Sequence, residues 1–201
     1  GTTGVDTFTN TNNGAATATL GGGIDIFTGG TAVDTIVIGT TAASADIIET
    51  FTSTADRVDL TTVLLNNSSA ALVDSGSLAG AATIDAAIAI SAVASQFIFS
   101  NAAFEVDLDP VTGSSMTAAE IVTLTTAART ALNATTKTNL DSTFLATETV
   151  IFVLDDTIDT SSAIFSFTNS TATGTTVDDG ELVLIAVVNA NAIMANGDII
   201  V

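Results

Sequence analysis

The sequence contains no cysteine, histidine, tryptophan or tyrosine, and it has a single proline. Without histidine and cysteine, the chain can build neither a Ser–His–Asp or Cys–His catalytic site nor a histidine-ligated metal site. It also cannot form a disulfide. Catalysis would have to rely on carboxylates or on a lone lysine. No apolar run reaches the roughly 18 residues of a membrane-spanning helix.

Basic residues are almost as scarce. Three lysines and arginines stand against 22 acidic residues, which gives a net charge of −19. Nucleic acids and anionic membrane surfaces are bound by clusters of lysine and arginine, and Arg57, Arg129 and Lys137 are too few for such a cluster. We therefore expect no nucleic-acid partner. Hydrophobic residues make up 47% of the 201 positions, enough for the core of one large domain or two small ones.

The N-terminal quarter repeats a glycine-rich frame, G-x-x-G-x-D-x-U-x, in which U is a large apolar residue. Copies span residues 1–9, 21–28 and 29–37, and a weaker copy has Ala16 in place of the aspartate. The glycines predict tight turns, and the residues after each aspartate predict a short strand with U pointing inward. Two units complete one coil. Asp6 and Asp25 should therefore stack on one side, with Asp34 above Ala16 on the other.

Stacked carboxylates and turn carbonyls supply the oxygen ligands that Ca²⁺ prefers. Departures from the frame at Thr2, Ala16 and Ala32 favour one or two ions over four. The alternative is a glycine- and threonine-rich solenoid edge without an ion. Asp46, Asp56 and Asp59, further along the chain, are either added ligands or solvated turn acids. The candidate metal ligands are Gly4, Asp6, Gly21, Gly23, Asp25, Gly29, Thr31, Asp34, Asp46 and Asp56.

These repeats resemble the calcium β-roll of RTX (repeats-in-toxin) proteins. The pattern D-x-I-x-x-F-x-x-x-x-D-x-V-D-L at 46–60 is similar to the segment that closes the roll in secreted RTX proteins, including serralysin-type proteases and surface-layer proteins. The resemblance implies Ca²⁺ as cofactor, export by type I secretion machinery and folding outside the cell. Arg57, flanked by Asp56 and Asp59, is expected to form a local ion pair.

The expected fold is mainly β: a short calcium β-roll, a parallel β-solenoid, at 1–62, then a linker at 63–82, then an α+β or β-sandwich-like unit at 83–201 with one or two helices. Ala/Ile spacing predicts a short helix over 84–93. A capping box at Thr117 and Glu120 predicts a helix over about 117–134. Strands are predicted at 96–100, 103–107, 148–154, 163–168, 181–188 and 198–201.

Acidic loops separate the later strands. The loop at 169–181 looks like a worn EF-hand loop with neutral early ligands, and the alternative is an ordinary acidic hairpin turn. Asp155, Asp156, Asp178 and Asp179 are candidates for the acid–base pair of a carboxylate-based hydrolase, but the chain has no tryptophan or tyrosine to form a substrate platform. We expect no enzyme. The tail at 197–201 is similar to an RTX export signal, or is a last strand pinned into a sheet.

The predicted function is that of a structural calcium-binding protein on the bacterial cell surface or secreted from it: the C-terminal part of a surface-layer or surface-assembly subunit. An open solenoid end exposes a strand edge that another copy can extend into a sheet or filament. Other expected partners are the secretion machinery and a cell-surface polysaccharide. The alternative is the calcium-dependent folding and secretion domain of a protease, toxin or adhesin. Gly1 already lies inside the frame, which predicts a piece of a longer chain.

Overall fold

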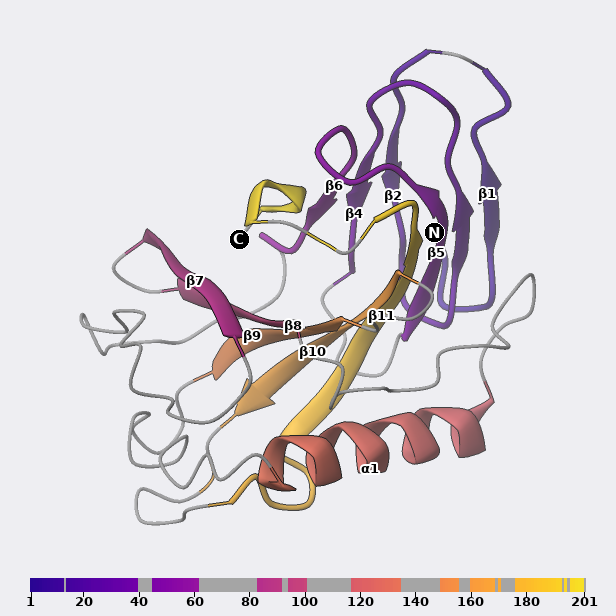
Figure 1. Ribbon diagram of the computed structural model, residues 1–201. Coiled ribbons are helices and arrows are strands. Elements are labelled where there is room, and N and C mark those ends of the chain that lie inside the picture. The colour runs from indigo at the N-terminus through magenta and orange to yellow at the C-terminus, as the bar shows by residue number, and fades with distance from the viewer. Residues whose placement is uncertain are drawn as a thin grey trace.

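The computed structural model describes residues 1–12, 14–39, 45–61, 83–91, 94–100, 117–134, 149–155, 160–168, 170, 176–192, 194 and 196–200. The described chain is mainly β, as expected, with one α-helix (Figure 1). The elements are β1 (Thr7–Thr9), β2 (Thr17–Thr19), β3 (Ile26–Thr28), β4 (Thr35–Val37), β5 (Asp46–Phe51), β6 (Arg57–Asp59), β7 (Thr83–Ser91), β8 (Ala94–Ser100), α1 (Ala118–Ala134), β9 (Thr149–Asp155), β10 (Ser161–Thr168), β11 (Leu182–Ala190), a 3-10 turn (Asn196–Asp198) and β12 (Ile199–Ile200).

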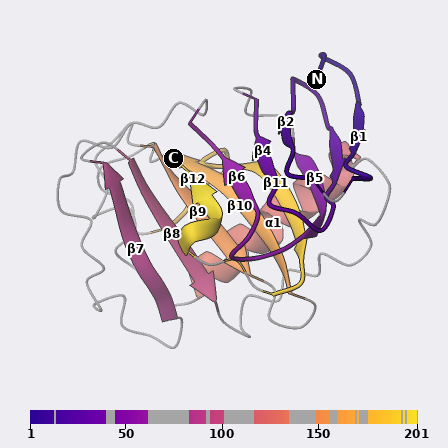
Figure 2. The same ribbon diagram turned by 90° about the horizontal axis from the view of Figure 1, so that it is seen from above.

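Successive N-terminal strands alternate between two parallel sheets. Strands β1, β3 and β5 lie side by side in sheet A, and β2, β4 and β6 lie side by side in sheet B (Figure 2). The register places Thr7 opposite Ile26 in sheet A and Thr17 opposite Thr35 in sheet B. The chain therefore returns to the same sheet after every second strand, which is the spacing that the repeat frame predicted.

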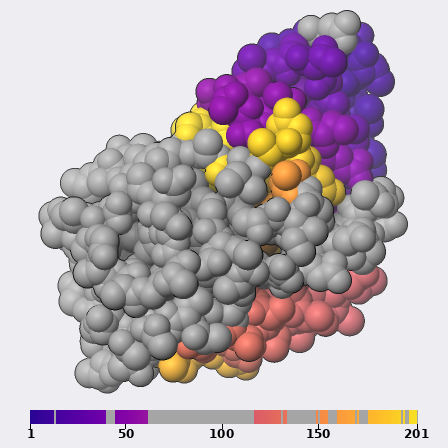
Figure 3. All heavy atoms as spheres, viewed as in Figure 1, coloured from indigo at the N-terminus to yellow at the C-terminus, as the bar shows by residue number. Residues whose placement is uncertain are grey.

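The C-terminal strands extend both of these sheets. Sheet A has eight strands in the order β1-β3-β5-β11-β10-β9-β8-β7, and sheet B has the order β12-β6-β4-β2. Strand β11 pairs parallel with β5, and β12 pairs parallel with β6. Figure 3 shows the C-terminal residues packed against the N-terminal region. The expected C-terminal unit thus shares its main sheet with that region, and the predicted linker at 63–82 lies outside the described residues.

The central strands of sheet A, β3, β5 and β9 to β11, contribute buried residues to both faces of the sheet. Sheet B and α1 pack against opposite faces of it, and each packing has its own apolar core. Neighbouring residues of β9 alternate between the two cores, since Ile151 faces sheet B and Phe152 faces α1. Strands covered on both faces are continuous apolar runs, which accounts for the sequence VIFVL at 150–154. Because its central strands are packed on both faces, sheet A holds in place the turns that precede β3 and β5 and carry Asp25 and Asp46.

The predicted helix over 84–93 is wrong, because residues 84–91 lie in β7, and residues 92–93 lie outside the described chain. Ile84 and Ile88 have helical spacing, but Ile88 and Ile90 alternate with small residues, and β-branched residues favour a strand. The helix over 117–134 is confirmed as α1, and none of the described helices is long and apolar enough to cross a membrane. Strands β8 to β12 confirm the other C-terminal predictions, except that 103–107 lies outside the described residues.

Candidate metal centre

Four aspartates of the N-terminal region each close their own turn. In each case one carboxylate oxygen accepts a hydrogen bond from the backbone N–H four residues earlier, so the side chain ties together the turn that precedes its strand. The four bonds run from Thr2 N to Asp6 Oδ2 (2.6 Å), Gly21 N to Asp25 Oδ2 (2.9 Å), Gly30 N to Asp34 Oδ2 (3.0 Å) and Thr52 N to Asp56 Oδ2 (2.7 Å).

The second carboxylate oxygen joins one coil to the next. Asp6 N donates to Asp25 Oδ1 at 2.8 Å, and Asp25 N donates to Asp46 Oδ1 at 2.9 Å. We call these three residues the first stack. On the other side, Ala16 N donates to Asp34 Oδ1 at 2.9 Å, and Asp34 N donates to Asp56 Oδ1 at 2.8 Å. We call Asp34 and Asp56 the second stack. The sequence predicted that Asp6 would lie beside Asp25 and Ala16 beside Asp34. The places of Asp46 and Asp56 in the two stacks were not predicted.

The predicted glycines lie where successive turns stack. Gly23 has φ 111°, and a Cβ atom there would lie 2.6 Å from the carbonyl oxygen of Gly4. A Cβ atom at Gly21 would meet the carbonyl oxygen of Thr2. These carbonyls therefore face the next coil. Gly29 donates its N–H to Glu49 O at 3.1 Å, and Thr31 is exposed in the same turn.

Asp46 departs from the pattern of the other aspartates. Its carboxylate is fully buried, and its Oδ2 atom has no hydrogen-bond partner. Burial raises the pKa of Asp46 to about 7, and the negative charge of Asp25 adds to this effect, while the hydrogen bond from Asp25 N opposes it. In contrast, hydrogen bonds from Thr2 lower the pKa of Asp6. The first stack therefore combines one carboxylate that is well hydrogen-bonded, Asp6, with one buried carboxylate, Asp46, whose Oδ2 atom has no hydrogen-bond partner.

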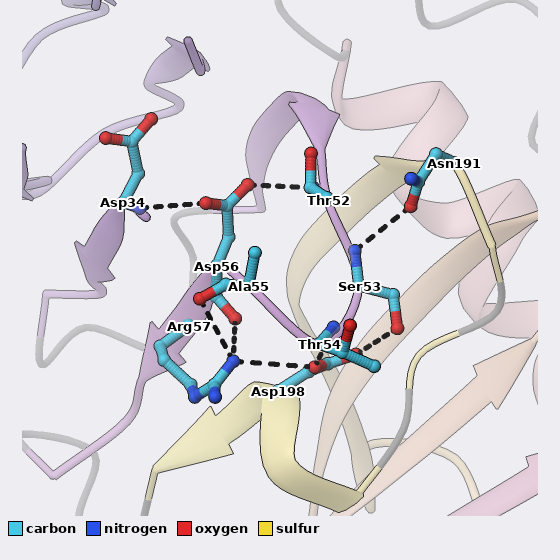
Figure 4. A network of polar contacts seen from close by, with 9 residues as sticks. All are labelled: Asp34, Thr52, Ser53, Thr54, Ala55, Asp56, Arg57, Asn191 and Asp198. Carbon is cyan, nitrogen blue, oxygen red and sulfur yellow. Dashed lines mark hydrogen bonds and ion pairs between the residues drawn. The ribbon is translucent and has the colours of Figure 1, made fainter. Parts of the chain in front are cut away.

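A residue absent from the predicted ligands, Asp198, binds the turn that precedes β6. Ser53 Oγ donates to Asp198 Oδ2 at 2.6 Å, and Thr54 N donates to Asp198 Oδ1 at 2.7 Å (Figure 4). Arg57 Nη1 lies 3.8 Å from Asp198 Oδ1 and donates to the backbone oxygens of Ala55 and Asp56.

In the described chain, the ion-pair partner of Arg57 is thus Asp198, and the expectation that a flanking acid would serve was wrong. The side chain of Asp198 is fully buried. The only sequence signal for Asp198 is the order glycine, aspartate, two isoleucines at 197–200, which repeats part of the frame.

The loop at 169–181 ends in another buried carboxylate. Glu181 accepts hydrogen bonds from Ser170 N at 2.7 Å, Ser170 Oγ at 2.6 Å and Asp178 N at 2.6 Å. Strands β10 and β11 on either side pair antiparallel, so the connection is a hairpin. Residues 156–159, 169 and 171–175 of the two acidic loops lie outside the described chain.

The aspartates differ in their remaining capacity for a cation. Asp34 already accepts three hydrogen bonds, the third from Asn10 Nδ2 at 2.8 Å, whereas Asp46 accepts one. Across the part of the chain that the structure describes, no three acidic side chains converge into a metal cluster. An ion in the first stack would therefore combine Asp46 Oδ2 with backbone carbonyls, a donor set made only of hard oxygens. This set suits Ca²⁺.

Comparison with known proteins adds no relative to this geometry. No family model, no curated protein and no solved structure matches the chain. The assignment of a function therefore rests on the residues themselves.

Proposed function

We propose that this chain is a structural protein whose N-terminal coils, residues 1–62, form a calcium β-roll of the RTX type. The observation that carries the proposal is the buried, unpartnered Oδ2 atom of Asp46 beside Asp25. A buried carboxylate is stable only when it is paired, hydrogen-bonded or protonated. A divalent cation bound at this oxygen would supply the missing partner.

The charge distribution supports the same conclusion. The side chains of Asp25, Asp34, Asp46 and Asp198 are 0% exposed in a chain of net charge −19. Among the described residues, Arg57 lies beside Asp198, and the positive charge of the N-terminal amino group partly offsets the rise in the pKa of Asp46 that burial causes. Each bound Ca²⁺ cancels two negative charges and binds only the folded form, so that its binding free energy adds to the free energy of folding.

The proposed site links folding to the compartment. Extracellular calcium modules bind at roughly 10⁻⁴–10⁻³ M, so such a site is empty in the cytosol and filled outside the cell. We infer a secreted or bacterial cell-surface protein that leaves the cell unfolded through type I machinery and folds on emergence. The buried acids are engaged with backbone donors, which favours a structural role over an enzymatic one.

The architecture also supports a role in surface assembly. The final strand β12 pairs with β6, and Leu60 N donates to Ile200 O at 2.7 Å, so the C-terminal strand stabilises the last strand of the N-terminal region. Strands β1 and β2 lie at the edges of their sheets. A surface-layer or related assembly subunit would use these sheet edges to join other copies. A cell-surface polysaccharide would anchor the assembly.

The proposal is tested by thermal unfolding of the full chain in excess EDTA, in millimolar CaCl₂ and in millimolar MgCl₂. We expect Ca²⁺ to raise the melting temperature, and Mg²⁺ to do so much less because it demands octahedral geometry and sheds water reluctantly. Equal melting temperatures in EDTA and CaCl₂ would remove the basis for a calcium β-roll.

A further inference from the structure

Side-chain nitrogen atoms take part in the second stack. Asn10 Nδ2 donates to Asp34 Oδ1 at 2.8 Å and to the backbone oxygen of Gly14 at 3.0 Å. One amide group thus joins a carboxylate to a backbone carbonyl, and both are oxygen types that bind Ca²⁺ in proteins. The N–H hydrogens of an amide repel a cation, so an ion could bind between these two oxygens only by displacing Asn10.

The Asn10 amide has a complete set of partners in this position. Asn12 N donates to Asn10 Oδ1 at 3.2 Å, so both N–H groups and the oxygen of the amide are hydrogen-bonded. Ala16 N donates to the same Asp34 Oδ1 atom at 2.9 Å. Ala16 stands where the repeat frame has an aspartate. The coil that lacks a carboxylate at this position therefore supplies two hydrogen-bond donors to the carboxylate of the next coil.

A second side-chain nitrogen lies in the turn that carries Asp56 (Figure 4). Arg57 Nη1 donates to the backbone oxygen of Ala55 at 3.1 Å and to that of Asp56 at 2.7 Å. The same nitrogen lies 3.8 Å from Oδ1 of the buried Asp198. Two backbone carbonyls and a carboxylate thus surround a guanidinium group, which stays charged at any pH near neutrality. The positive charge that an ion would bring to these oxygens is already present.

The donors to the first stack are of a different kind. In the described chain, Asp25 accepts from the backbone N–H groups of Asp6 and Gly21. Asp46 accepts from the backbone N–H of Asp25, and its Oδ2 atom has no hydrogen-bond partner. The two sides of the roll therefore differ, because the first stack offers a buried oxygen to an ion and the second stack engages its oxygens with side-chain nitrogens.

We propose that Ca²⁺ binds only on the side of the first stack, and that Asn10 and Arg57 take the place of an ion on the side of the second. This inference rests on the calcium β-roll proposed above and limits its ions to one side. Asp34 and Asp56, both predicted as metal ligands, serve on the other side as hydrogen-bond acceptors for the turns. The second stack should therefore keep its turns without Ca²⁺.

Two matched substitutions separate the stacks. Asp46 and Asp56 are both buried, and Oδ1 of each accepts from the backbone N–H of the preceding aspartate in its stack. Asp46→Asn and Asp56→Asn each keep one carbonyl acceptor and remove one negative charge. In calorimetric titrations with CaCl₂, we expect fewer bound ions in Asp46→Asn and the wild-type number in Asp56→Asn. Loss of an ion in Asp56→Asn would overturn the proposal.

Asn10→Asp tests the same idea by a gain of binding. It replaces the amide nitrogen by an oxygen, so that two carboxylates and the carbonyl of Gly14 converge. In EDTA, we expect a lower melting temperature than that of the wild-type chain, because the two carboxylates repel each other. Millimolar CaCl₂ should restore the melting temperature, and calorimetry should show one more bound ion than in the wild-type chain.

Asn12→Asp is the control for Asn10→Asp, because the side chain of Asn12 is exposed and the change in net charge is the same. We expect no additional ion in this variant. If the melting temperature of Asn10→Asp is lowered equally in EDTA and in CaCl₂, Asn10 does not stand in the place of an ion and the proposal fails.

The wild-type chain separates this inference from the proposed function. A wild-type chain that binds no Ca²⁺ refutes the proposed function, whereas a calcium response gained by Asn10→Asp would still support the role of Asn10. Calcium binding by the wild-type chain together with loss of an ion in Asp56→Asn refutes only the inference.

Discussion

Among the described residues, Asp46→Asn removes the one buried carboxylate oxygen that lacks a hydrogen-bond partner. The effect of this substitution on the stability of the chain should change sign when Ca²⁺ is added. The amide keeps the shape of the side chain and one acceptor for Asp25 N. Without calcium at pH 8, we expect the variant to be more stable than the wild-type chain, because no charge is buried. With calcium, the wild-type chain should gain stability and the variant should gain less.

The magnitude follows from the pKa of Asp46, which is raised from 3.8 to about 7 in the folded chain. Below about pH 4 the group is protonated in both the folded and the unfolded states, and the stabilising effect of the bound proton is complete. As the pH rises through 7, the folded carboxyl ionises and this stabilisation is lost. One pKa unit corresponds to about 1.4 kcal/mol, so the loss is at most about 4 kcal/mol.

Urea unfolding of both proteins at pH 5 and pH 8, in EDTA and in CaCl₂, measures this effect. Asp179→Asn is the matched control, because its side chain is 98% exposed and the substitution changes the net charge equally. The ion pair that Asp179 forms with Arg129 lies at the surface, where such pairs contribute little to stability. We expect the free-energy difference between variant and wild-type chain to grow from pH 5 to pH 8 only for Asp46→Asn. If Asp46→Asn and Asp179→Asn behave alike in EDTA, Asp46 carries no buried charge and the reasoning fails.

Three further substitutions test the stacked turns, the C-terminal contact and the helix. Gly23→Ala should destabilise the chain in urea unfolding by up to about 3 kcal/mol, because φ is 111° and a Cβ meets Gly4 O. Gly180→Ala, at φ 86° with open space around it, should cost only the backbone strain of about 1–2 kcal/mol. Asp198→Ala leaves the donors of Ser53 and Thr54 without their acceptor, so we expect the free energy of unfolding to fall by about 3 kcal/mol and hydrogen exchange in β6 to become faster. Unchanged hydrogen exchange in β6 would contradict the contact. Thr117→Ala removes the acceptor of the capping bond from Glu120 N to Thr117 Oγ1, which should destabilise α1 by about 1 kcal/mol, read as helix loss in circular dichroism.

The repeat frame predicted the local geometry because its glycines and aspartates act within one or two coils. The contacts between Asp6 and Asp25 and between Ala16 and Asp34 follow directly from that spacing. The capping box at Thr117 is equally local, and it begins α1 where the sequence predicts.

Long-range pairing was the part that sequence reasoning missed. Nothing local shows that β11 continues sheet A beside β5, or that Asp198 meets Ser53 and Thr54, which are 145 and 144 residues away. The helix predicted at 84–93 failed for a related reason, because pairing with β8 selects the strand from a sequence that fits both periods. The missing partner of Asp46 Oδ2 is also visible only in three dimensions.

Calcium titration by calorimetry at neutral pH, on the wild-type chain and on Asp46→Asn, tests the central claim most directly. The account predicts that the wild-type chain binds Ca²⁺ with a dissociation constant of roughly 10⁻⁴–10⁻³ M, and that Asp46→Asn binds at least one ion fewer. Equal numbers of bound ions in the two proteins, or no binding by the wild-type chain, would contradict it.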